Sequence, residues 1–92
     1  MEDCLIVCAL GHAPPGALPP WGGLVECAEE HGLVWFRPIG ERLHRLPAGV
    51  LWGRFPGPRE ALQAFDRAID AASDLLGYTV SVNRRVVRLD FG

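Results

Sequence analysis

The chain has 92 residues, a formal net charge of −2 and a hydrophobic fraction of 49%. This length suits one domain, so we expect a single α+β domain over residues 1–92. The negative charge argues against a general nucleic-acid binder, and no stretch approaches the roughly 18–20 apolar residues that span a bilayer. Because so small a body cannot bury all of this apolar surface, self-association or a partner surface is favoured.

Charge is distributed unevenly along the chain. Residues 1–36 contain no Arg or Lys and sum to −5, whereas residues 37–92 carry every basic residue and sum to +3. The first residues, Met1-Glu2-Asp3, are acidic where a secretory signal is basic. Three cysteines are an odd number, unlike the paired cysteines of small secreted scaffolds. We therefore expect a cytoplasmic protein.

The first third of the chain predicts a strand, a loop and a hairpin. Residues 4–10, CLIVCAL, form a short apolar run that is typical of a central strand covered on both faces. Residues 11–23 contain four Pro and four Gly and predict a long loop, which either binds a partner or docks Trp21 as a plug over the sheet. Residues 24–28 and 33–37 flank Glu-Glu-His-Gly and predict a β-hairpin.

Residues 50–55 predict a further strand, and a helix follows it over residues 58–76. Pro58 suits the first helical position, and Gly77 suits a left-handed C-cap. Apolar residues recur at steps of three and four and form one stripe: Ala61, Leu62, Phe65, Ala68, Ile69, Ala72, Leu75 and Leu76. This stripe predicts a helix that packs on one face of a sheet.

The end of the chain alternates apolar and polar residues over 78–82 and again over 85–91. This pattern predicts a second hairpin, with Asn83-Arg84 as a two-residue turn. The expected fold is α+β, with one amphipathic helix on an antiparallel or mixed sheet of about five to six strands. It is similar to a ferredoxin-like fold, with the Pro/Gly loop in place of the first helix.

Two kinds of chemistry use the cysteines and histidines. Cys8, His12, Cys27 and His31 have ligand types that suit zinc, although Cys4 and Cys8 on one strand lie about 13 Å apart and cannot share a metal. Alternatively, Cys27 is a thiol nucleophile near His31 or His44, with Glu26 or Glu30 orienting the imidazole. Buried cysteines that behave as small apolar residues are the simpler interpretation.

The arginines offer a nucleic-acid alternative. Arg84, Arg85 and Arg88, with Arg37, Arg42, Arg45 and Arg54, would bind phosphate if they form one surface, and Trp35 or Trp52 would stack on bases. The acidic face of the helix and the acidic first third oppose this reading.

The leading hypothesis is a non-enzymatic protein–protein interaction module, a regulatory, inhibitory or accessory subunit that is homo-oligomeric or binds another protein. No catalytic residue, cofactor or resident metal is expected. The residues we expect at the partner interface are Trp21, Arg84, Arg85 and Arg88.

Overall fold

A computed structural model of the chain describes residues 1–12, 16, 21–38 and 48–88. The fold is α+β, with two helices and a four-strand antiparallel sheet. The elements are, in chain order, β1 (Glu2–His12), α1 (Trp21–Glu30), β2 (Val34–Pro38), β3 (Ala48–Phe55), α2 (Pro58–Leu76) and β4 (Ser81–Arg88).

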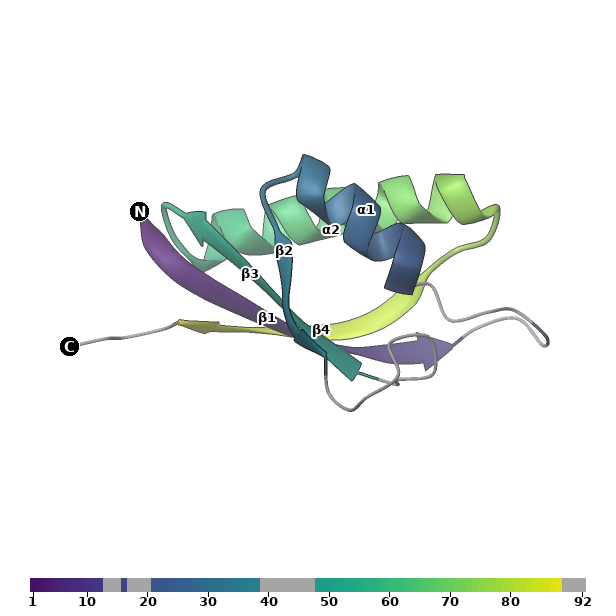
Figure 1. The fold of residues 1–92 in the computed structure, drawn as a ribbon, viewed down its shortest axis with the longest axis horizontal. Helices are drawn as coiled ribbons and strands as arrows, with labels where there is room; N and C mark the ends of the chain where they lie inside the picture. The colour runs from purple at the N-terminus through teal and green to yellow at the C-terminus, as the bar shows by residue number, and fades with distance from the viewer. Residues whose placement is uncertain (13–15, 17–20, 39–47, 89–92) are drawn as a thin grey trace.

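The strands lie in the order β2-β3-β1-β4, so β1 and β3 are central and β2 and β4 are edges. Both helices lie on the same side of the sheet (Figure 1). The central position predicted for residues 4–10 is confirmed. The prediction that both faces of this strand are covered is wrong for the described elements, because the helices cover one face only.

The helix-facing side of the two central strands alternates small and large residues. The buried residues Cys4, Ile6 and Cys8 of β1 lie opposite Gly53, Leu51 and Gly49 of β3. The Trp35 ring from β2 lies over Gly49, and the Phe55 ring lies over Gly53. Phe65 of α2 is the largest fully buried side chain and completes this layer.

The predicted helix over 58–76 is confirmed, and so are its two ends. Pro58 occupies the first turn, and the Gly57 carbonyl accepts a hydrogen bond from the Ala61 amide at 3.2 Å. Gly77 has φ of +79° and donates to the Ser73 carbonyl, the left-handed C-cap that the sequence predicts. The stripe is shorter than predicted, because Leu75 is 60% exposed and Leu76 is 37% exposed.

The hairpin predicted over residues 24–37 is wrong in its first half, since residues 21–30 form helix α1. Leu24, Cys27 and Ala28 are buried, which is helical spacing rather than strand alternation. The helix ends in a Schellman motif: Gly32 has φ of +82°, its amide donates to Glu29, and the Leu33 amide donates to Ala28. The Gly that suggested a hairpin turn therefore ends a helix.

The second half of that hairpin, residues 33–37, corresponds to β2 (Val34–Pro38), and residues 50–55 lie in β3. The first helix is present as α1, so the prediction that a Pro/Gly loop replaces it is wrong. Of that loop, residues 11–12 belong to β1 and residues 21–23 to α1, while 13–15 and 17–20 lie outside the described residues.

The final hairpin is also wrong, because residues 81–88 form one continuous strand along β1. Asn83 pairs with Ala9, and Arg84 pairs with Cys8, where the sequence predicted a turn. Arg is a poor turn residue, and β1 offers an edge long enough to pair with all of β4. The described residues therefore contain four strands instead of five to six.

We expect Gly53→Ala to lower the free energy of unfolding by about 2–3 kcal/mol, because a new Cβ overlaps the Phe55 ring and lies 2.7 Å from the Gly32 carbonyl oxygen. Gly22→Ala in α1 is the matched control. Its Cβ meets nothing within 4 Å, so the variant gains up to about 0.5–1 kcal/mol from helix propensity. Urea denaturation followed by circular dichroism measures both. Equal effects of the two changes would contradict the packing described here.

Candidate interaction surfaces

The sheet face turned away from the helices, called the open face below, is largely apolar. Along β1, the helix-facing residues Cys4, Ile6 and Cys8 are fully buried, whereas the alternate residues Leu5, Val7 and Ala9 keep part of their surface accessible. The strand register places these residues beside open-face residues of the other strands, which are Val34 of β2, Val50, Trp52 and Arg54 of β3, and Asn83, Arg85 and Val87 of β4. No helix of the described residues lies over this face (Figure 1).

The size of the open face follows from sheet geometry. Four strands spaced about 4.8 Å apart, averaging eight residues that each rise about 3.3 Å, cover roughly 500 Å². Two such faces in contact bury roughly 1,000 Å², which is the lower limit for a specific interface. The face is thus large enough for one modest protein contact.

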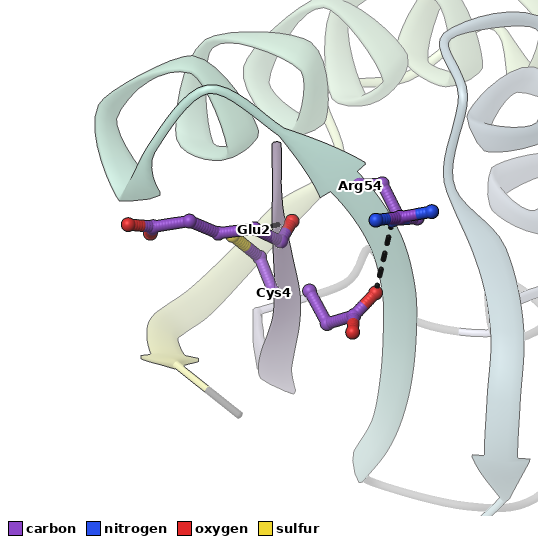
Figure 2. A network of polar contacts seen from close by, with 4 residues as sticks. Glu2, Cys4 and Arg54 are labelled. Carbon is purple, nitrogen blue, oxygen red and sulfur yellow. Dashed lines mark hydrogen bonds and ion pairs between the residues drawn. The ribbon is translucent and has the colours of Figure 1, made fainter. Parts of the chain in front are cut away.

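Charges on the open face lie toward its margins. Arg54 and Asp3 are direct cross-strand neighbours, and their side chains form an ion pair with Nε and Oδ1 3.4 Å apart (Figure 2). The Arg54 side chain is 61% exposed, so the pair adds little stability, but it keeps this end of the face nearly neutral. Arg85 is exposed on β4 and forms no ion pair with any residue the structure describes.

A groove of about 340 Å³ runs between α2 and β4 on the helix side. Phe65 and Val80 are buried beneath it, and Ile69 and Val82 are half-buried in its wall. Asp66, Asp70 and Arg84 are exposed at its rim, where Arg84 holds Asp66 through two contacts of 3.2 Å.

Ser73 joins the two elements that border this groove, through hydrogen bonds to two of the groove residues. The Ser73 hydroxyl donates to the Ile69 carbonyl at 2.9 Å and accepts a hydrogen bond from the Val80 amide at 2.9 Å. This double contact joins the last turn of α2 to the segment that leads into β4. These hydrogen bonds fix the position of α2 relative to the start of β4, and these two elements border the groove.

The residues expected at a partner interface do not form one patch. Arg84 and Arg85 are consecutive in β4 and point to opposite faces of the sheet, with Arg84 toward α2 and Arg85 on the open face. Trp21 begins α1 and Arg88 ends β4, but their side chains lie outside the described part of the structure.

The residues of the nucleic-acid alternative also lie on opposite faces of the sheet. Trp52 lies on the open face and Trp35 on the helix-facing side, so the two rings cannot stack on one strand of bases. Arg54 is exposed on the open face, while Arg42 and Arg45, and the side chain of Arg37, lie outside the described residues.

The zinc candidates come from separate elements. Cys8 is fully buried on β1, Cys27 is buried on α1, and His31 is half-buried after that helix. His12 ends β1 and its side chain is not described. Within the described ranges, no three His, Cys, Asp or Glu side chains are grouped to hold a metal ion.

Cys8 and Cys27 lie in surroundings that favour the protonated thiol. None of Cys4, Cys8 and Cys27 is in a disulfide. Burial raises the pKa of the Cys8 thiol to about 11, and its Sγ donates to the Gly49 carbonyl at 3.6 Å. Burial, with the charges of Glu30 and Glu26, raises the pKa of the Cys27 thiol. A nucleophilic cysteine needs the opposite shift, and His44 lies outside the described residues.

The open face is the feature that sequence reasoning missed. The sequence pattern that indicates this face is Val50-Leu51-Trp52-Gly53-Arg54, in which Val50, Trp52 and Arg54 belong to the open face and the residues between them belong to the helix-facing side. In residues 4–10 both faces are apolar, so alternation was invisible there. The edge position of β4 was also missed, because Asn83-Arg84 was predicted to be a turn between two strands.

Comparisons with known proteins return nothing: no protein-family model, no curated protein and no solved structure matches the chain. Among the residues that the structure describes, no helix has the length and apolar character needed to cross a membrane.

We expect all three cysteines to react slowly with a soluble disulfide reagent in the native protein and rapidly in denaturant, because each is buried. Absorbance at neutral pH follows the release of the coloured thiol. Fast stoichiometric labelling of one native cysteine would contradict the burial.

We expect stability to fall as the pH rises from 9 to 11. The folded Cys8 thiol holds its proton up to pH about 11, whereas the unfolded chain releases it near 9.0, so alkali favours unfolding. Between these values the wild type loses about 2 kcal/mol more than Cys8→Ala, measured by urea denaturation at several pH values. Parallel profiles for the two proteins would refute this.

Proposed function

We propose that this protein is a non-enzymatic protein–protein interaction module whose open face binds a second copy of the chain. The observation that carries the proposal is the apolar row Trp52–Leu5–Val87, which crosses three strands on a face that no described helix covers. Apolar surface of this extent is favourably buried against another protein.

A second copy is the occupant that the side-chain sizes and the charges of the face favour. Two sheets pack face to face about 10 Å apart by interleaving side chains of moderate size, and the central open-face residues Leu5, Val7 and Val50 have that size. The Asp3–Arg54 pair neutralises one end, so two copies meet without strong repulsion there. A two-fold pair is the commonest outcome of such a self-complementary patch.

The surroundings of Cys8 and Cys27 support a non-enzymatic role. Burial raises the pKa of both thiols, and a raised pKa opposes nucleophilic activity. The absence of disulfides among the three cysteines supports a cytoplasmic location. We also infer a ferredoxin-like arrangement, since the element order β-α-β-β-α-β and the sheet order β2-β3-β1-β4 support it.

Trp52→Lys tests the proposed interface. We expect the wild type to form a dimer at micromolar to millimolar concentration and the variant to raise the dimer dissociation constant at least about tenfold, because a charge then enters the apolar contact. Sedimentation velocity over a concentration series measures this.

Leu75→Lys is the matched control, because Leu75 is 60% exposed at the end of α2 and away from the open face. We expect it to dimerise like the wild type. Circular dichroism establishes that both variants are folded. A wild type that stays monomeric up to about 1 mM, or a control as defective as Trp52→Lys, would refute the proposal.

A further inference from the structure

We propose that the outer edge of β4, with the groove beside it, binds an extended peptide in which acidic and apolar residues alternate. This site goes beyond the proposed function, because it uses the outer edge of the sheet and the groove on the helix side, and takes only Arg85 from the margin of the open face. The two surfaces can therefore be tested separately.

The backbone of β4 supplies the first part of the site. The strand pairs with β1 on one side, and none of the described strands pairs with its other side. In an antiparallel sheet, alternate residues of an edge strand direct their N–H and C=O groups outward. An added peptide strand satisfies these groups by main-chain hydrogen bonds.

The groove supplies the apolar specificity. A strand added beyond β4 places every second side chain on the helix side, next to Val82 and along the groove that α2 borders. Phe65 and Val80 give this groove an apolar floor, and Ile69 gives it an apolar wall. Side chains of valine or leucine size fit a hollow of about 340 Å³ and lose water there.

The charges beside β4 differ between the two faces of the sheet, so they favour different residues on the two faces of a bound peptide. On the open side, Arg85 is exposed and has no acidic partner among the described residues, so an acidic side chain is attracted there. On the helix side, Arg84 is already held by Asp66, and the exposed Asp70 repels a second acid. Acidic residues are therefore favoured on one face of the peptide only.

A second copy of β4 is a poor occupant of this edge. Antiparallel pairing centred on Arg84 or Arg85 places that arginine directly opposite its own copy. Like charges directly opposite each other in a sheet are destabilising. The arginines therefore protect the edge against self-pairing and select an acidic strand.

The probe is a blocked, fluorescein-labelled peptide of three Glu-Val repeats between Ser-Gly ends, measured by fluorescence anisotropy. A peptide of equal composition with three Glu followed by three Val tests the alternation. A Lys-Val repeat tests the charge. We expect the alternating Glu-Val peptide to bind at least about tenfold more tightly than either control, and more weakly as salt increases.

Arg85→Glu gives the test within the protein. We expect it to weaken Glu-Val binding at least about tenfold and to create binding of the Lys-Val peptide, since the attraction is reversed. Arg67→Glu is the matched control, because Arg67 is exposed on α2 and does not line the groove. Trp52→Lys should retain peptide binding, which separates this site from the open face.

Each of the following results would overturn the proposal: no Glu-Val binding at about 1 mM, equal binding of the block peptide, equal loss in Arg67→Glu and Arg85→Glu, or no gain of Lys-Val binding by Arg85→Glu. The proposal would also be overturned if an unlabelled uridine hexanucleotide displaced the labelled peptide at a lower concentration than unlabelled Glu-Val peptide does. That result would indicate that the edge of β4 binds nucleic acid.

Discussion

The fold depends on the close fit of aromatic rings over two glycines of β3. Gly49 leaves room for the Trp35 ring, and Gly53 leaves room for the Phe55 ring. The facing residues of β1 are cysteines, which are also small, so the rings lie close to the sheet. The layer between sheet and helices is thus filled by a few rings over a surface of small residues, and a single added methyl group disturbs it.

This layer makes the two faces of the sheet unequal. On the helix side, alanines at 61, 64, 68 and 72 allow α2 to approach closely and bury its stripe. On the open side, Leu5, Val7, Val50 and Trp52 keep only their neighbours within the sheet as cover from the described elements. Much of the high apolar fraction of the chain is therefore accounted for by a second surface that resembles half of a core.

Helix α2 and three of the strands could be predicted from local pattern, because Pro58, Gly77 and the helical spacing between them are short-range signals. Helix α1 could not, since Gly22 and Gly23 are poor helix formers and its Schellman end at Gly32 resembles a hairpin turn. The course of β4 was set by the long edge of β1, and Arg84 reaches Asp66 from within a strand. The candidate surfaces depend on these non-local pairings, so residue types alone could not show that Arg84 and Arg85 lie on opposite faces of the sheet.

The pairing of β1 has a consequence for the order of assembly. Cys4 lies opposite Gly53 on one side and opposite Arg88 on the other, so the first strand finds both neighbours only after most of the chain has been synthesised. Contacts between residues this far apart in sequence close large loops and slow folding. Until then, an apolar strand with two unpaired edges and two thiols remains accessible on the ribosome. The nascent chain is consequently most vulnerable to aggregation and oxidation before β4 emerges.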